Sequence, residues 1–357
     1  MKQYFILGRN PELSRQEILS YLNARKQKFK EIFFENNYLL IELKKEIKIN
    51  ELGGTIKSGI TSSEGSESTV ESYIFANDLI QENKFSYALF GNTEPDLLKL
   101  KFKSEKRKAV LKHGRKKIRF QDKKDSPMPK ADHYFFLHFD KDVFYFGKIN
   151  QAYDSRSVEF RDMNKPQRRE HLAISPRLAK ILVNLSEAKD NNTLLDPFCG
   201  IGGIIQESLL KNINSFGIDN DKMAIYYAKK NMSWLQTKYK IKPYYNVKCQ
   251  DARLAPNKQF DAIATETPLG EILRRKPQDH KAQQIIRSFE RLIIPILRQL
   301  KRVKKHNAKI AITFPKIKNN GVDYDHILEE TNLRIHKKPI LESREKQFIS
   351  REIVVFV

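Results

Sequence analysis

Four acidic residues each come after a short apolar segment in the second half of the sequence. Asp196 ends TLLD, Asp219 ends SFGID, Asp251 comes just after VKC, and Glu266 ends FDAIATE. In open α/β sheets, ligands bind outside the carboxyl ends of the strands. Turns favour aspartate for local reasons, so one such residue would indicate little. Four in succession predict a row of carboxylates at one sheet edge, suited to accept hydrogen bonds from a nucleoside.

The segment LLDPFCGIGG, residues 194–203, has the pattern of a strand, an acidic residue, a glycine-rich turn and a helix. Glycines at such a turn let the backbone approach a ligand closely. The segment is neither the GxxxxGK[ST] loop of phosphate-binding ATPases nor the GxGxxG loop of nicotinamide-binding folds. Asp219, about twenty residues further on, is placed to accept hydrogen bonds from both ribose hydroxyls. Asp251 can accept one from an adenine amino group.

The segment TETPLG, residues 265–270, has two interpretations. A carboxylate, a proline and a glycine at a strand end form either a catalytic loop or an ordinary strand-to-helix turn. Covalent catalysis by a thiolate is disfavoured, because Cys199 lies in the glycine-rich loop and Cys249 precedes Asp251. Arg274 and Arg275 follow the segment, and they fit either a nucleic-acid backbone contact or a solvated helix start.

The pattern of elements changes along the chain. After Asn192, short apolar segments alternate with helical ones, which indicates a mostly parallel sheet covered on both faces. Just before it, SPRLAKILVNLS predicts a helix capped by Ser175 with Pro176 in its first turn. Nearer the start, Ser14 and Glu17 form a capping-box pattern. The polar stretch SSEGSES, 62–68, is expected to be a flexible connection.

The charge of the chain is strongly positive. Lys and Arg number 66 against 43 Asp and Glu, a net charge of +23. Such an excess indicates a polyanionic partner such as nucleic acid, or else a lysine-rich solvated surface. Between residues 101 and 124, twelve basic residues face only two acidic ones. This segment fits a surface that follows a phosphate backbone, and it fits a solvated face equally well.

Other features exclude several classes of protein. The two cysteines form no CxxC motif and the eight histidines have no ligand-like spacing, so we expect neither a disulfide framework nor a metal site. No apolar run approaches the roughly 20 residues of a membrane helix. The first residues, MKQYFILGRN, contain too short an apolar stretch for a signal peptide. We therefore expect a cytoplasmic protein without membrane association.

The motifs DPFCGIGG, GIDND, CQDAR and REIVVF together resemble those of the class I S-adenosylmethionine-dependent methyltransferases. The chain is most similar to the THUMP-containing RNA guanine-N2 methyltransferases, which include enzymes that modify guanosine ten of tRNA. FILGRNPELSRQEI, LGGTIK, SRSVEFRDMNKPQRR and AISPRLAKILVNL extend the resemblance over most of the chain, most weakly over 60–130.

The resemblance implies an α/β protein of four parts. These are an N-terminal ferredoxin-like α/β segment (1–60), a THUMP-like RNA-binding domain (61–150), a connector with an entry helix (151–190) and a methyltransferase domain (191–357). The last would be a Rossmann-like domain with a mixed seven-stranded sheet, and the part before it would be α+β.

The resemblance also implies the site residues. S-adenosylmethionine would be the cofactor, with Asp219 at its ribose and Asp251 and Ala252 at its adenine. The glycine-rich loop would shape the methionine pocket. The full cofactor-binding set is Asp196, Phe198, Cys199, Gly200, Gly202, Asp219, Asn220, Asp251, Ala252 and Glu266. The expected RNA-binding residues are Lys112, Arg115, Lys116, Lys117, Arg119, Arg274 and Arg275.

Enzymes that methylate exocyclic amino groups usually carry [DN]PP[YF] where this chain has Glu266, Thr267, Pro268 and Leu269. There the acid or amide and the first proline's carbonyl accept from the target amino group, and the aromatic ring stacks on the flipped base. No strong base is needed, because positioning supplies much of the rate. Glu266 keeps the carboxylate, Thr267 lacks the fixed backbone of proline, and Leu269 lacks the stacking ring, at a cost of roughly 1–3 kcal/mol.

These observations predict an S-adenosylmethionine-dependent tRNA methyltransferase that modifies the N2 amino group of a guanosine, with position ten the expected target. The alternatives are a tRNA-binding protein with a weak or lost methyltransferase activity, and a DNA amino-methyltransferase. We expect a monomer. Some relatives need a small activating subunit, and the sequence leaves open whether this chain does.

Overall fold

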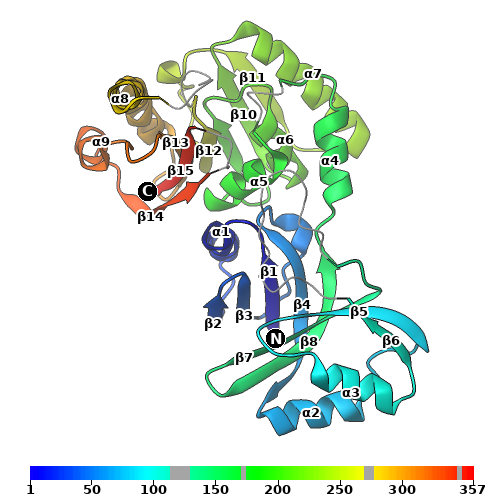
Figure 1. Ribbon diagram of the computed structural model, residues 1–357. Helices are drawn as coiled ribbons and strands as arrows, with labels where there is room; N and C mark the ends of the chain where they lie inside the picture. The colour runs from blue at the N-terminus through cyan, green and yellow to red at the C-terminus, as the bar shows by residue number, and fades with distance from the viewer. Residues whose placement is uncertain (113–128, 170–173, 269–276, 344–347) are drawn as a thin grey trace. The chain divides into compact units, whose positions relative to one another are not determined.

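The computed structural model describes residues 1–112, 129–169, 174–268, 277–343 and 348–357 (Figure 1). The chain divides into two compact units. The first unit comprises Met1–Arg15, Gln27–Asn50 and Gly54–Tyr153, and the second comprises Gln16–Lys26, Glu51–Gly53 and Asp154–Val357. The division passes through helix α1 (Pro11–Ala24).

The first unit is built on an eight-stranded mixed sheet with the order β2-β3-β1-β4-β8-β7-β5-β6. β5 pairs in parallel with β6 and β7, and the other neighbours are antiparallel. The strands are β1 (Lys2–Leu7), β2 (Phe29–Glu35), β3 (Tyr38–Leu43), β4 (Thr55–Gly65), β5 (Lys84–Phe90), β6 (Lys108–Leu111), β7 (His133–Asp140) and β8 (Val143–Ala152). The helices are α2 (Glu67–Ala76) and α3 (Asp96–Ser104), and η1 (Ile49–Glu51) is a short 3₁₀ turn.

Alternation along the strands gives this sheet two apolar faces. In β7, Phe135 and Leu137 pack in one cluster with Leu98 and Phe102 of α3, while Phe136 packs in another with Tyr4 of β1. This is the period of two that buries both faces of a pleated sheet.

The predicted boundary at residue 60 falls inside a continuous sheet. Residue 60 lies within β4, which pairs with β1 on one side and β8 on the other. The prediction of a flexible connection at 62–68 is wrong. These residues continue β4 to Gly65, and Ser66 then caps α2 by accepting from the Thr69 N–H. The assignment of residues 61–150 to a THUMP-like domain stays a prediction.

The second unit contains a seven-stranded sheet with the order β11-β10-β9-β12-β13-β15-β14. The first five strands run parallel, and β15 lies antiparallel between β13 and β14. The strands are β9 (Thr193–Asp196), β10 (Asn214–Asp219), β11 (Tyr245–Cys249), β12 (Ala262–Glu266), β13 (Ile310–Lys316), β14 (Ile335–Glu342) and β15 (Ser350–Phe356). The predicted mixed seven-stranded sheet is therefore confirmed.

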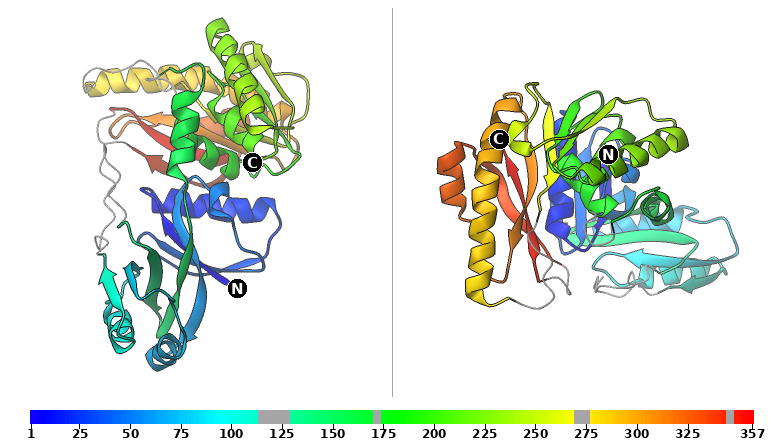
Figure 2. Two further views of the ribbon diagram at one scale, coloured as in Figure 1. Left: turned by 90° about the vertical axis from the view of Figure 1, so that its right-hand side faces the viewer. Right: turned by 90° about the horizontal axis from the view of Figure 1, so that it is seen from above.

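Helices cover both faces of this sheet, as its apolar strands require. α8 (Asp279–Val303) and α9 (Tyr324–Thr331) lie on one face, and α5 (Pro176–Leu185), α6 (Gly203–Leu210) and α7 (Lys222–Tyr239) lie on the other (Figure 2). α4 (Ser155–Asn164) precedes α5, and η2 (Ala252–Leu254) follows β11. The core on the α8 face contains Phe289, Ile293 and Leu297 of α8 against Ile312 and Phe314 of β13.

Local capping was predicted correctly in one place and wrongly in another. The Ser175 hydroxyl accepts from the Leu178 N–H at 3.3 Å with Pro176 in the first turn, so the predicted start of α5 is confirmed. The capping box at Ser14 and Glu17 is wrong, because α1 begins at Pro11 and its cap is Asn10, four residues before Ser14. The Asn10 side chain accepts from the Leu13 N–H, and Glu17 instead accepts from the Gly53 N–H and the Asn184 amide.

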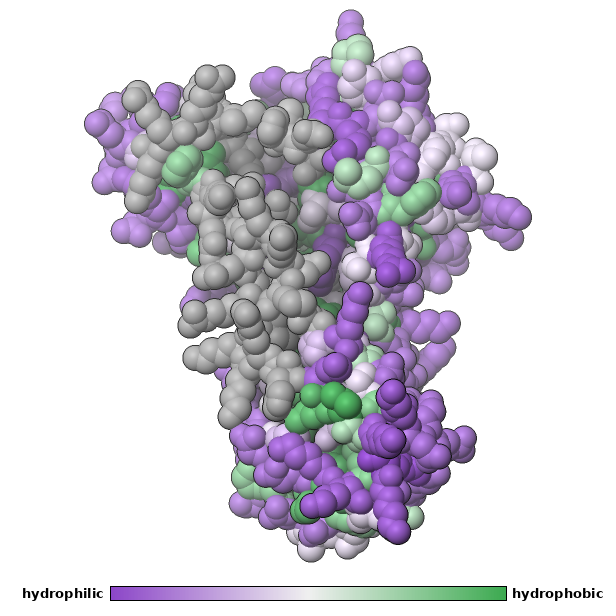
Figure 3. Space-filling view, turned by 45° about the vertical axis from the view of Figure 1, so that its right-hand side comes forward, coloured by the Kyte–Doolittle hydropathy of each residue, from purple (hydrophilic) through white to green (hydrophobic). Residues whose placement is uncertain are grey.

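Among the described residues, no helix combines the length and the apolar character needed to cross a membrane. Hydrophilic residues predominate on the part of the face in Figure 3 that is not drawn in grey.

Candidate functional site

The carboxyl end of β9 leads into a tight turn before α6. The Cys199 N–H donates to the Ile218 carbonyl of β10 at 3.0 Å, and the Gly202 N–H donates to the Cys199 carbonyl at 2.8 Å. Gly200 and Gly202 have φ angles of 51° and 89°. A side chain at Gly202 would also come within 2.7 Å of Met232, whereas one at Gly200 would meet nothing within 4 Å. The backbone at Gly200 therefore faces open space where a ligand can approach it.

Asp219 ends the neighbouring strand β10 and is tied to this turn. Its Oδ2 accepts from the Gly200 N–H at 2.9 Å, and its Oδ1 accepts from the Asp221 N–H at 3.0 Å. Each carboxylate oxygen has a second lone pair, so the group can still accept hydrogen bonds from a diol. The expected ribose ligand thus lies beside the expected methionine loop.

Asp196 is the most deeply buried of the four acids, with 1% of its surface exposed. Its Oδ1 accepts from the Thr265 hydroxyl at 2.6 Å and from the Phe198 N–H at 3.2 Å. The pKa of Asp196 is raised to about 7, mainly by desolvation and to a smaller extent by the charges of Asp219 and Glu266, while the two hydrogen bonds oppose this rise only in part. Three of the four predicted acids therefore act on one another.

Asp251 differs from the other three. It caps η2, and its carboxylate accepts from the Arg253 N–H at 2.8 Å and from the Arg253 guanidinium at 2.6 Å. These side-chain and backbone hydrogen bonds lower the pKa of Asp251. The neighbouring Ala252 is buried. The Asp251 carboxylate is thus paired with Arg253, whose side chain is exposed.

The segment TETPLG leaves the sheet between β9 and β13. Oε1 of Glu266 accepts from Nε of Arg351 on β15 at 2.5 Å, and the two side chains are 14% and 13% exposed. The Thr267 N–H donates to the Thr313 hydroxyl at 3.2 Å, and the Thr267 hydroxyl donates to the Thr313 carbonyl at 2.6 Å. Pro268 is exposed, and Leu269 lies outside the described residues.

Sequence reasoning missed Thr265, Thr313 and Arg351. Thr265 lies within the segment singled out above, and its position before Glu266 gave no indication that it would reach Asp196. In the sheet, Glu266 pairs with Thr313, and Arg351 lies opposite Pro315.

 The bonded pairs Thr267–Thr313 and Glu266–Arg351 are separated by 46 and 85 residues, so only the register of the sheet brings them together.

The predicted RNA-binding residues are mostly outside the described part of the chain. Lys112 is exposed just after β6, while Arg115, Lys116, Lys117, Arg119, Arg274 and Arg275 lie in the ranges that the structure does not describe. Two other members of the basic segment have internal partners. Lys101 is buried and pairs with Glu105 at 2.6 Å, and Arg107 pairs with Asp78 at 2.7 Å. These two cations stabilise the first unit and are not free to follow a phosphate backbone.

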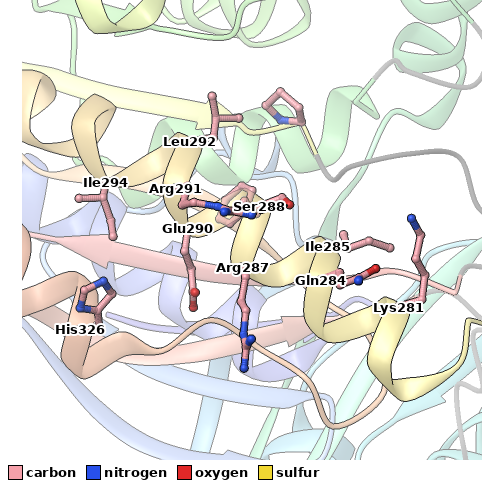
Figure 4. Close-up of a pocket in the computed structure, with 12 residues that line it drawn as sticks. Lys281, Gln284, Ile285, Arg287, Ser288, Glu290, Arg291, Leu292, Ile294 and His326 are labelled. Carbon is pink, nitrogen blue, oxygen red and sulfur yellow. Dashed lines mark hydrogen bonds between the residues drawn. The ribbon is translucent and has the colours of Figure 1, made fainter.

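A groove of about 790 Å³ runs along α8, with Pro268 of the TETPLG segment among its lining residues. Figure 4 shows side chains from successive turns of α8 around it, together with His326 of α9. Its exposed cations are Lys281, Arg287 and Arg291. Within the described ranges, none of these three has a carboxylate at ion-pairing distance, and Glu290 already accepts from the Asp323 N–H at 2.6 Å.

A family model matches part of this chain, and a solved structure aligns with all of it. Residues 166–319 match a family model described as the RMKL-like methyltransferase domain. A solved structure of TrmN from Thermus thermophilus aligns with 100% of this chain and 99% of its own, with a TM-score of 0.56 and 12% sequence identity. At that identity the likeness shows the fold alone.

The second unit has a class I methyltransferase fold. A structure described as a predicted N6-adenine-specific DNA methylase from Listeria monocytogenes also aligns, with a TM-score of 0.50 and 12% identity over 99% of this chain and 95% of its own. The fold therefore does not distinguish RNA from DNA as the substrate.

Curated relatives are similar over shorter stretches. The tRNA (guanine(10)-N2)-dimethyltransferase of Pyrococcus abyssi is 35% identical over 124 residues, which is 34% of each chain. The protein of that name from Methanocaldococcus jannaschii is 27% identical over 178 residues, 47% of this chain and 46% of its own. The chain thus spans about one-third to one-half of the length of these curated relatives.

The buried carboxyl of Asp196 should make the stability of the protein depend on pH. Its pKa is raised in the folded state, so the folded protein binds this proton more tightly than the unfolded chain does. The free energy of unfolding should therefore decrease as the pH rises from about 4 to about 7, by up to about 4 kcal/mol from this group.

Asp196→Asn removes the titrating group and keeps an acceptor for Thr265. The decrease in unfolding free energy between these pH values should become smaller in the variant, as measured by denaturant titration at a series of pH values. An unchanged pH dependence would show that Asp196 is ionised in the folded protein throughout this range.

Proposed function

We propose that this protein transfers a methyl group from S-adenosylmethionine to the exocyclic N2 amino group of a guanosine in tRNA. Two lines of support combine. Curated relatives that are similar to part of this chain carry the name tRNA (guanine(10)-N2)-dimethyltransferase. The site places a carboxylate, Glu266, at the carboxyl edge where Asp196 and Asp219 also end their strands.

The residues at this edge fit the cofactor. The open space beside the Gly200 backbone suits a ligand that approaches the turn closely, and the Asp219 carboxylate suits the two hydroxyls of a ribose. Asp196, Phe198, Cys199 and Gly202 shape the same turn, Asn220 follows Asp219, and Asp251 and Ala252 lie after the next strand. When bound, S-adenosylmethionine supplies a methyl group already activated by its sulfonium.

The proposal depends most on the hydrogen bonds of the Glu266 carboxylate. Oε1 accepts from Arg351, and no described residue donates a hydrogen bond to Oε2. Oε2 of Glu266 and the carbonyl of Thr267 are therefore acceptors for the two hydrogens of a target amino group. Holding both hydrogens orients the nitrogen lone pair, which is the part of the reaction that the protein must supply.

A thiolate mechanism is not supported by the environment of the cysteines. Cys199 is buried, and desolvation raises the pKa of its thiol well above the ordinary value. Cys249 is exposed at the end of β11, away from the segment that follows β12. Methylation of a ring carbon through a covalent adduct is therefore disfavoured, and transfer to an amino group fits better.

The groove along α8 supports an RNA substrate. Its three cations lack acidic partners among the described residues, and the groove is lined at one point by Pro268, next to the amino-acceptor residues. A phosphate backbone bound in this groove would lie beside Pro268, which is two residues after Glu266. Lys112 and the predicted basic residues beyond it would bind tRNA at a second place. A cytoplasmic location, a monomeric state and any need for an activating subunit stay predictions.

Glu266→Ala should lower the rate of methyl transfer to tRNA by about 100-fold or more, because one of two amino-group acceptors is lost. The affinity for S-adenosylmethionine should stay within a few-fold of the wild-type value. Labelled-methyl transfer and isothermal titration calorimetry measure the two quantities. Glu329→Ala, on the exposed surface of α9, is the matched control. Full activity of the Glu266 variant would place the catalytic loop elsewhere.

Asp219→Ala should weaken S-adenosylmethionine binding by about 10- to 100-fold, since hydrogen bonds to a charged acceptor contribute roughly 1.5–3 kcal/mol. Asp219→Asn, which keeps one acceptor, should lose less. Titration calorimetry with the cofactor alone tests this without any RNA. Unchanged affinity in the alanine variant would remove the ribose assignment.

Replacing Lys281, Arg287 and Arg291 together with alanine should weaken tRNA binding and make it less dependent on salt. Each lost phosphate contact should reduce the slope of log K against log salt by about 0.7–0.9. Filter binding at several salt concentrations measures this slope. A control with the same loss of charge replaces Lys229, Lys242 and Arg302, which are exposed outside the groove. Equal slopes for the two triple variants would show that the groove does not bind the backbone.

A further inference from the structure

The amino-acceptor segment has a threonine where comparable enzymes usually have a proline. Proline fixes φ near −65° and has no N–H to satisfy. Threonine leaves φ free and has an N–H that needs a partner. The carbonyl of Thr267 would therefore be poorly positioned unless another part of the protein restrains it. Thr267 is nevertheless buried, with 2% of its surface exposed, and a buried N–H needs a partner.

Strand β13 supplies that restraint through Thr313. The Thr267 N–H donates to Oγ1 of Thr313, and the Thr267 hydroxyl donates to the Thr313 carbonyl, at 3.2 and 2.6 Å. Thr313 is fully buried and pairs with Glu266 in the parallel ladder. The two hydrogen bonds therefore hold the chain against β13 for one residue beyond the end of β12.

Strand β15 restrains the other acceptor through Arg351. Because β15 runs antiparallel to β13, its first residues lie at the carboxyl edge of the parallel strands. Arg351 is opposite Pro315, two positions before Ile353, which pairs with Thr313. From there its Nε reaches Oε1 of Glu266 at 2.5 Å, in an ion pair that is largely shielded from solvent.

A charge-assisted hydrogen bond from a guanidinium to a shielded carboxylate is short and strong, and it restrains the oxygen that accepts it. With Oε1 held, Oε2 has a defined position, and it has no hydrogen-bond donor in the described part of the chain. The two restraints act on adjacent residues and come from different strands. Together they define where both acceptor atoms of the segment lie.

We propose that Thr313 and Arg351 are positioning residues that hold the Glu266 carboxylate and the Thr267 carbonyl in the arrangement that a proline supplies elsewhere. The role of these residues in catalysis rests on the proposed amino-group methylation. Neither residue need touch the substrate. Each acts through the acceptor to which it is hydrogen-bonded, so its loss should lower kcat more than it changes the binding of the cofactor.

Thr313→Val tests the first restraint, because valine has nearly the same shape and lacks the hydroxyl that accepts from Thr267. The rate of methyl transfer should fall by about 10- to 100-fold, with the Kd for S-adenosylmethionine within twofold of wild type. Adding Thr267→Pro to this variant should restore at least part of the rate, since proline has no N–H and fixes its own φ. A purely structural role of Thr313 would not produce this rescue.

Arg351→Gln tests the second restraint and should lower kcat by a similar factor, whereas Arg351→Lys, which keeps the charge, should retain more of it. The matched control is Lys316→Gln, which removes the neighbouring ion pair between β13 and β15, Lys316 to Glu352 at 2.7 Å. That variant should lose stability and keep its kcat. Thermal unfolding of every variant separates the two effects.

Hydrogen exchange gives a readout without catalysis. The amide of Thr267 should exchange more slowly in the wild type than in Thr313→Val. An active wild type with unaffected Thr313 and Arg351 variants, or an equally exchanging amide, would overturn the positioning role alone. A wild type that binds tRNA and cofactor without transferring a methyl group would overturn the proposed function, and the catalytic role of both residues with it.

Discussion

The buried carboxyl of Asp196 connects the two loops on which the site depends. It accepts from the N–H of Phe198 in the glycine-rich turn and from the hydroxyl of Thr265 in β12, one residue before Glu266. A buried polar group must be hydrogen-bonded, so these two contacts fix the turn after β9 relative to the segment after β12. The expected cofactor loop and the expected acceptor loop are thereby held in one geometry.

Asp196 and its two neighbouring carboxylates lie in three different environments. Asp196, Asp219 and Glu266 would repel one another if all were ionised and unpaired. The surroundings of each carboxylate reduce this repulsion in a different way. Asp196 is buried and its pKa is raised, Asp219 accepts from two backbone N–H groups, and Glu266 is paired with Arg351. Different environments can thus give neighbouring carboxylates different roles.

Much of the fold of the second unit could be predicted from the sequence, because alternating strands and helices and the residues at strand ends are local features. The mixed seven-stranded sheet and the start of α5 follow from such features. The start of α1 was mistaken because Asn10 caps the helix ahead of the more conspicuous Ser14. Strand register is not local, and for that reason neither Thr313 nor Arg351 could be assigned to the site in advance.

Because strand pairing is not a local feature, the organisation of the first unit also differs from the one expected from the sequence. Strands β1 and β4 pair with each other, and β4 pairs with β8 from beyond the expected domain boundary, so the sequence suggested two segments where one sheet is present. Side-chain partners such as Glu105 for Lys101 also require the folded chain. A basic segment read from sequence alone therefore overestimates the number of cations available to a nucleic acid.

In the proposed reaction, the acceptor pair at Glu266 and Thr267 receives the amino group of a guanine in tRNA. The most direct measurement is nucleoside mass spectrometry of unmodified tRNA after incubation with the protein and S-adenosylmethionine carrying a labelled methyl group. We expect labelled N2-methylguanosine or N2,N2-dimethylguanosine. Label in a methylated adenosine or on a ring carbon, or no label in tRNA that the protein binds together with the cofactor, would contradict it.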